Sequence, residues 1–174
     1  MSQRNSGDER RPNDDYSTPY WVTEALIPHL PMRNCVLWEC AAGSGQMVDA
    51  LRRAGFTVIA TDVAGGSDFL TVDLPRPFQG IVTNPPYELA TEFIERALSL
   101  IPTDGFVAML LRCDFDSAKT RGHLFGRCPE FAKKLTLVER IRWFEDYPAI
   151  PSFNHAWFLW SRAHSGPPTI AYAP

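Results

Sequence analysis

The stretch that decides the fold is residues 36–48, VLWECAAGSGQMV. Its apolar start predicts a buried strand and its small residues predict a tight turn. The apolar stripe that begins at Met47 predicts a helix closed by Gly55. A strand that enters such a turn and then a helix lets a ligand approach backbone N–H groups at the positive end of that helix. We therefore expect a ligand-binding turn here.

Strands and helices alternate on both sides of this stretch. Thr18-Pro19 is a helix-start signal, and a second apolar stripe at helical spacing runs from Leu89 to Leu98. Further strands are predicted at residues 57–62, 80–83, 106–111, 135–142 and 155–161. Alternation with continuous apolar strands predicts an α/β fold whose mainly parallel sheet is covered by helices on both faces.

Size and composition indicate one soluble domain. The 174 residues are 45% apolar and 21% charged, with a net charge of −3. We expect a single domain over 16–164, with flexible tails at 1–15 and 165–174. No stretch is apolar enough for a membrane helix or a signal peptide, so no membrane association is expected and the cytoplasm is the expected location. The four cysteines form no CxxC pair and the four histidines show no ligand spacing, so no metal site is expected.

Charge is distributed unevenly along the chain. Residues 1–111 hold eight basic and fourteen acidic side chains, whereas residues 112–142 hold eight basic and four acidic ones. The basic segment 112–142 fits either a surface for a polyanion or an ordinary solvated face.

Asp62 ends the strand that follows the glycine turn, 19 residues after Gly43. An acid at this place can accept hydrogen bonds from ribose hydroxyls. Val48 stands where a dinucleotide fingerprint has its third glycine, and the chain has no Gly-Lys-Ser/Thr for a triphosphate. The pattern favours an adenosine-containing ligand without a pyrophosphate. The alternative is a tight turn with an aspartate that only caps its neighbours.

The most specific motif is Asn84-Pro85-Pro86-Tyr87, which directly follows a predicted strand. Two prolines remove backbone donors and leave rigid carbonyl acceptors, to which the asparagine adds another. Together these groups can hold an amino group by both hydrogens while Tyr87 offers a flat face for stacking. Such an arrangement suits a weakly basic amino nucleophile that needs positioning. The alternative is a proline turn with a core tyrosine.

With these motifs in this order, the chain resembles the S-adenosylmethionine-dependent DNA adenine-specific N(6)-methyltransferases, in their gamma arrangement. The resemblance runs from about Tyr16 to Arg162 and implies a Rossmann-like class I methyltransferase fold with a seven-stranded sheet. It implies catalytic roles for Asn84, Pro85, Pro86 and Tyr87. The cofactor residues that it implies are Tyr16, Thr18, Pro19, Glu39, Ala41, Gly43, Gly45, Asp62, Val63, Asp68 and Phe69.

The resemblance implies methyl transfer to the 6-amino group of adenine in DNA, with extrusion of the base. Phe144, which adjoins Trp143, is the residue expected to stack on that base. Arg112, Lys119 and Arg121 are expected to contact nucleic acid, with DNA favoured over RNA. No separate target-recognition domain is expected, so target choice would come from the basic segment 112–142 and the loop 144–154. The same motif also occurs in families that methylate adenine in RNA or a glutamine amide in protein, and an inactive nucleic-acid-binding homologue is a further alternative.

Overall fold

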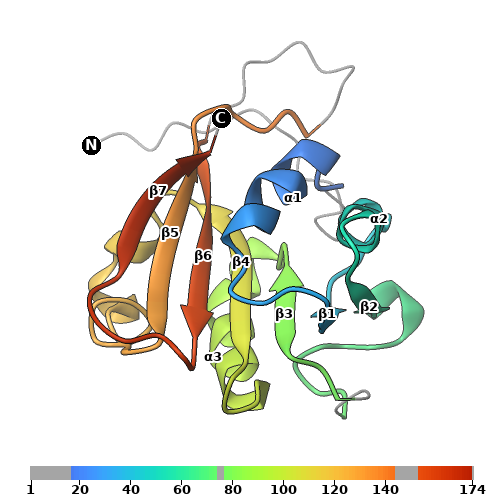
Figure 1. Cartoon of the computed structure of the whole chain (residues 1–174), viewed down its shortest axis with the longest axis horizontal. Helices are drawn as coiled ribbons and strands as arrows, with labels where there is room; N and C mark the ends of the chain where they lie inside the picture. The colour runs from blue at the N-terminus through green and yellow to red at the C-terminus, as the bar shows by residue number, and fades with distance from the viewer. Residues whose placement is uncertain (1–16, 74–76, 144–152, 174) are drawn as a thin grey trace.

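One seven-stranded sheet forms the centre of the computed structural model, which describes residues 17–73, 77–143 and 153–173 (Figure 1). The strands are β1 (Val36–Glu39), β2 (Thr57–Ala60), β3 (Gly80–Thr83), β4 (Phe106–Arg112), β5 (Phe131–Leu137), β6 (His155–Ser161) and β7 (Thr169–Ala173). Their spatial order is β2-β1-β3-β4-β6-β5-β7, and only β6 runs antiparallel to its neighbours. The predicted mainly parallel sheet is confirmed.

Helices cover both faces of the sheet. The α-helices are α1 (Tyr20–Leu26), α2 (Gln46–Arg53) and α3 (Ala90–Leu100). Short 3-10 turns lie at η1 (Ile27–His29), η2 (Val63–Gly65), η3 (Tyr87–Leu89), η4 (Phe115–Ser117) and η5 (Lys119–Arg121). Apolar residues of α1 and α2 share one core cluster, whereas those of α3 belong to the other.

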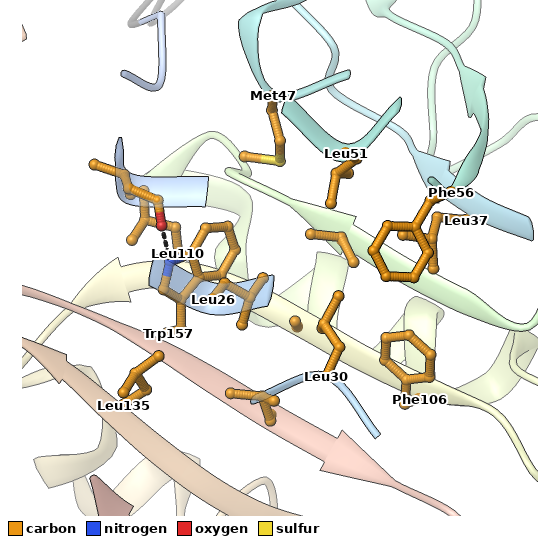
Figure 2. Packing of buried hydrophobic residues seen from close by; sticks show 14 of the residues in the cluster. Leu26, Leu30, Leu37, Met47, Leu51, Phe56, Phe106, Leu110, Leu135 and Trp157 are labelled. Atoms are coloured by element: carbon orange, nitrogen blue, oxygen red, sulfur yellow. Dashed lines mark hydrogen bonds between the residues drawn. The ribbon is translucent and has the colours of Figure 1, made fainter. Parts of the chain in front are cut away.

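The core on the α1 and α2 face is drawn in Figure 2. Leu26 and Leu51 from the two helices pack with Leu110 and Trp157 from the central strands. The Trp157 indole N–H donates to the carbonyl of Val22 at 2.9 Å, which ties α1 to β6. Alternate residues of the same strands point to the opposite face, so strands buried on both sides read as unbroken apolar runs.

Strand β5 differs from its predicted position. It covers Phe131–Leu137 instead of residues 135–142. Lys133 and Lys134 interrupt its apolar pattern, yet both are only partly exposed in the sheet. The Lys134 ammonium donates to Asp116 and to the carbonyl of Cys113, and these partners let a charged side chain occupy a central strand.

The seventh strand lies where a flexible tail was expected, so that prediction is wrong for residues 169–173. Strand β7 pairs in parallel with β5, with Leu135 opposite Ala171 and Leu137 opposite Ala173. The small alanines pack on the core while Ile170 and Tyr172 are 67% and 69% exposed. Pairing with a strand more than thirty residues earlier therefore specifies β7.

The carboxyl ends of β1, β2, β3 and β4 meet at one edge of the sheet, because these strands are parallel neighbours. Strand β6 begins at this same edge, where His155 lies opposite Arg112. Ligands of open α/β sheets bind at such an edge. In the described ranges, no helix combines the length and apolar character needed to cross a membrane.

Candidate active site

A cavity of about 610 Å³ opens at the carboxyl ends of β1, β2 and β3. Three loops and the segment before α1 form its wall. The predicted site residues that line it are Thr18, Glu39, Ala41, Gly43, Asp62, Val63, Asp68, Phe69, Asn84, Pro85, Pro86 and Tyr87. Residues from five separate stretches of the sequence therefore line one cavity.

The turn after β1 has the left-handed backbone that its glycines allow. Gly43 has φ 47° and Gly45 has φ 85°, and Gly45 N–H donates to the carbonyl of Ala42 at 2.8 Å. Asp62 braces this turn, since one of its carboxylate oxygens accepts from Gly43 N–H at 2.9 Å and the other from Ala64 N–H at 2.8 Å. The aspartate thus does cap its neighbours, and each oxygen keeps a second lone pair for a ligand hydroxyl.

Glu39 is a buried acid in the cavity wall, with 1% of its surface exposed. Its Oε1 accepts from the Thr83 hydroxyl at 2.6 Å and from Ala41 N–H at 3.0 Å. Its Oε2 is buried and has no hydrogen-bond partner among the described residues. Burial raises the pKa of Glu39 to about 8, with a smaller contribution from the charge of Asp62, so the carboxyl is mostly protonated at pH 7.

The Asn84 corner follows β3 directly. The Asn84 side-chain N–H₂ donates to the Thr18 hydroxyl at 3.1 Å, which fixes the amide from the segment before α1. Asn84 Oδ1 is buried and no described residue donates to it. A buried amide oxygen without a donor is costly, and an amino group in the cavity would satisfy it.

His155 supports Tyr87 in this corner, and Trp143 packs in turn against His155. The Tyr87 ring stacks on the imidazole of His155, with centroids 5.9 Å apart, and Trp143 meets His155 edge-on at 5.3 Å. His155 is buried, and burial lowers its pKa to about 4, with Arg112 adding to the effect. The imidazole is therefore uncharged at physiological pH and offers a flat ring on which Tyr87 stacks.

The turn at residues 68–72 forms the far wall. Asp68 closes this turn by accepting from Leu70 N–H at 2.9 Å. Phe69 is almost fully buried and packs against Trp38 and Phe93, with ring centroids 5.1 and 4.8 Å away. Val63 stands at the rim and is 67% exposed.

Three further predicted residues lie outside the cavity wall, and two more belong to segments outside the described residues. Pro19 caps α1 and Gly45 caps α2, and neither lines the cavity. Lys119 is exposed in η5, away from the cavity lining. Tyr16 and Phe144 lie outside the described residues, as does most of the loop 144–154.

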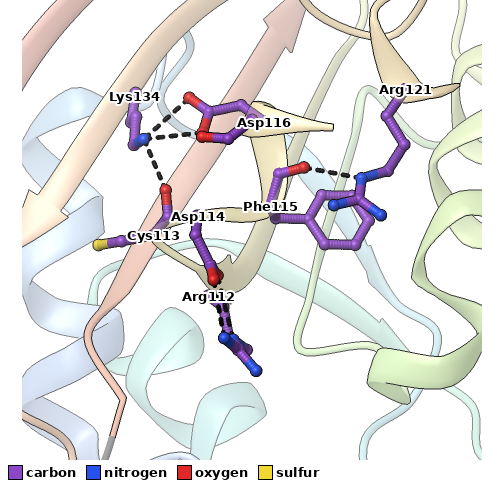
Figure 3. Close-up of polar contacts among 8 residues, drawn as sticks. Arg112, Cys113, Asp114, Phe115, Asp116, Arg121 and Lys134 are labelled. Carbon is purple, nitrogen blue, oxygen red and sulfur yellow. Dashed lines mark hydrogen bonds and ion pairs between the residues drawn. The ribbon is translucent and has the colours of Figure 1, made fainter. Parts of the chain in front are cut away.

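Arg112 and Arg121 of the basic segment 112–142 have partners within the chain. Arg112 forms two hydrogen bonds to Asp114, at 3.1 and 2.7 Å (Figure 3). Arg121 donates to the carbonyl of Phe115 at 2.7 Å and lies over its ring at 4.1 Å. Arg112 and Lys134 are thus paired with acids of the same segment, which leaves these two cations less available to a polyanion, whereas the surplus of basic over acidic side chains in the segment stays the same.

Several lining residues were not predicted from the sequence. They are Ser17, Cys40, Ala42, Ser44, Gln46, Met47, Ala64, Ser67, Leu89 and Phe93. Most are immediate neighbours of predicted ones, such as Ser17 and Ser44, whose hydroxyls lie 2.6 Å apart. Phe93 carries no signal beyond its place in an apolar helix stripe. Across the described part of the chain, no group of three or more His, Cys, Asp or Glu side chains could hold a metal ion.

The sequence matches no protein-family model and no curated protein. Solved structures share the fold. A type I restriction-modification methyltransferase subunit from Streptococcus thermophilus has a TM-score of 0.63 at 13% identity, covering 86% of this chain and 45% of that one. A modification subunit of a putative type I restriction enzyme from Vibrio vulnificus gives 0.58 at 13%, covering 96% and 47%.

A putative class I S-adenosylmethionine-dependent methyltransferase from Listeria monocytogenes is similar as well, with a TM-score of 0.59 at 12% identity, covering 88% of this chain and 62% of that one. The chain thus spans less than two thirds of each of these three proteins. Its seven-stranded sheet with flanking helices is the Rossmann-like fold of class I methyltransferases.

Proposed function

We propose that this chain is an S-adenosylmethionine-dependent methyltransferase that acts on the 6-amino group of adenine in DNA. The observation that carries the proposal is the Asn84-Pro85-Pro86-Tyr87 corner, which lines the same cavity as the glycine turn and leaves the buried Asn84 Oδ1 without a donor among the described residues.

The cavity fits the proposed cofactor. Its volume of about 610 Å³ lies within the range usual for small-molecule sites. Asp62 offers carboxylate lone pairs for ribose hydroxyls, and Asp68 with Phe69 offers an acid and a ring for adenine. Glu39 Oε2 has no hydrogen-bond partner among the described residues, and a cationic amino group bound beside it would favour the ionised form of this carboxyl. The cofactor supplies a methyl group on a positively charged sulfur.

Asn84 and Pro85 position the nucleophile. Asn84 Oδ1 and the Pro85 carbonyl accept the two hydrogens of the amine, so that its lone pair points at the methyl carbon. Transfer of the methyl group to this nitrogen would leave the electron pair of the broken C–S bond on the sulfur of the cofactor. The amine nitrogen, which has taken the positive charge, then releases one proton to solvent. The residues thus provide orientation, and the reaction needs no strong base.

Tyr87 supports a base that has left the duplex. Extrusion costs a few kcal/mol of unstacking, and stacking of a base on an aromatic ring returns about 1–3 kcal/mol. His155 keeps the Tyr87 ring in place from behind. Two of the similar structures are subunits of restriction-modification systems, which supports DNA as the substrate. A DNA substrate also favours a cytoplasmic location.

The test is a methylation assay with labelled S-adenosylmethionine and separate pools of DNA, RNA and protein, read by mass spectrometry. We expect 6-methyladenine in DNA. Asn84→Ala should lose this product and still bind S-adenosylhomocysteine in isothermal titration. Asn34→Gly is the matched control, because Asn34 precedes β1 and so lies at the edge of the sheet opposite the cavity. Its φ of 54° is one that glycine adopts without strain, so the substitution should leave both the fold and the activity unchanged.

Each other outcome contradicts a stated part of the proposal. Methylation only of RNA, or only of a glutamine amide, would overturn the substrate assignment. A wild-type chain that binds no S-adenosylhomocysteine would overturn the cofactor assignment, and equal activity in Asn84→Ala would overturn the role of the corner.

A further inference from the structure

Arg96 reaches from α3 to the turn that forms the far wall of the cavity. Its Nε donates to the carbonyl of Phe69 at 2.6 Å and its Nη2 to the carbonyl of Val72 at 2.7 Å. The guanidinium carbon also lies 6.0 Å from the centre of the Phe69 ring. One side chain of α3 thus holds two backbone carbonyls of a turn more than twenty residues earlier.

The turn needs such a brace because it does not belong to the sheet. Residues 66–73 form no strand, although they lie between β2 and β3 in the chain. The carbonyl of Asp68 accepts from the N–H groups of Thr71 and Val72, at 3.0 and 2.8 Å, which closes the turn on itself. The bonds from Arg96 then attach the closed turn to α3.

Helix α3 joins both sides of the site. It continues from η3, whose first residue is Tyr87, and so begins directly after the Asn84 corner. Arg96 lies later on the same helix. Helix α3 and the hydrogen bonds of Arg96 therefore connect the Asn84 corner to the turn that carries Asp68.

We propose that Arg96 is a positioning residue for ligand binding, which holds Asp68 and Phe69 where they contact the adenine of a nucleoside ligand. This inference rests on the proposed cofactor. Arg96 does not line the cavity, so it acts through the turn and not by contact with the ligand. Only arginine offers two N–H groups in a fixed fork to two separate carbonyls, so lysine replaces its charge but not its geometry.

The experiment measures the Kd of S-adenosylhomocysteine for Arg96→Met and Arg96→Lys by isothermal titration. We expect Kd to rise at least tenfold in Arg96→Met and less in Arg96→Lys. Turnover at saturating cofactor should change less than threefold, because Asn84 and Pro85 are untouched. Added guanidinium should restore part of the lost affinity in Arg96→Met. Arg52→Met is the matched control, because Arg52 on α2 donates to the carbonyl of Val58 outside the cavity wall.

A double-mutant cycle with Asp68→Ala separates positioning from general loss of structure. If Arg96 acts through the turn, the Kd of S-adenosylhomocysteine for the double variant should be close to the higher of the two single-variant Kd values. Independent effects would instead multiply the two increases in Kd. A Kd for Arg96→Met within twofold of wild type, or losses that multiply, would overturn the inference. Absence of binding by the wild-type chain would instead overturn the proposed cofactor, so the two failures are distinguishable.

Discussion

Replacing Glu39 with glutamine should change how the stability of the protein depends on pH. The carboxyl is 1% exposed and burial raises its pKa to about 8 from the ordinary value of 4.5. Between pH 4.5 and pH 8 the folded protein therefore holds a proton at Glu39 that the unfolded chain has lost. The free energy of unfolding must fall as the pH rises through this window, by about 1.4 kcal/mol per pH unit from this group alone.

Glutamine resembles the protonated acid and does not titrate. Its amide oxygen can keep the hydrogen bonds from the Thr83 hydroxyl and Ala41 N–H. We expect Glu39→Gln and wild type to differ little in stability at pH 5, and the variant to gain about 3–4 kcal/mol over wild type by pH 8. The sign follows from the raised pKa, since the stability contributed by the protonated group is lost as pH approaches 8.

Urea unfolding followed by circular dichroism at pH 5, 6, 7 and 8 measures the difference. Every other titrating group is common to both proteins, so subtracting the two curves isolates Glu39. Thr83→Val is a useful companion, because it removes the donor to Glu39 without removing the carboxyl. Parallel curves for wild type and Glu39→Gln across the whole range would refute the reasoning, because they would mean that Glu39 titrates alike in both states.

Three further substitutions test other parts of the fold. His155→Phe keeps a ring beside Tyr87 but removes the titrating group. Because the pKa of His155 is lowered to about 4, the free energy of unfolding of wild type should fall by about 3 kcal/mol relative to the variant between pH 7 and pH 4. Equal losses of stability in urea unfolding would contradict this. Gly45→Ala should cost about 1–2 kcal/mol through its φ of 85° alone, whereas Gly65→Ala, also without a close neighbour, should be nearly neutral; similar urea midpoints would disprove the strain. Gly80→Ala should destabilise by about 1–3 kcal/mol because its Cβ would lie 2.5 Å from the ring of Phe106, and an unchanged melting temperature would show that the ring moves freely.

The central part of the fold was predictable because its signals are local. Strands β1, β3, β4 and β6 are buried on both faces, so their apolar runs mark them directly. Strands β5 and β7 were misplaced or missed because their stability depends on distant partners. Lys134 is acceptable in β5 only because Asp116 lies beside it, and β7 exists by pairing with β5.

The cavity was predictable where a motif marks a strand end. Glu39, Asp62 and Asn84 each end or follow a strand of one parallel sheet, so topology alone brings them together. Hydrogen-bond partners were not predictable in the same way. The bonds from Arg96 and the ion pair of Arg112 depend on side-chain directions that spacing along the chain does not specify.

The bonds from Asp62 to Gly43 N–H and Ala64 N–H have a consequence for affinity. Both are made within the chain, so the glycine turn is ordered by folding itself. Ordering the backbone costs about 1–2 kcal/mol of conformational entropy per residue, and a preorganised turn has already met this cost before any ligand arrives. Contacts that a ligand makes with the turn therefore contribute to binding without that penalty. Loosening Asp62 would weaken binding even for a ligand that never touches its carboxylate.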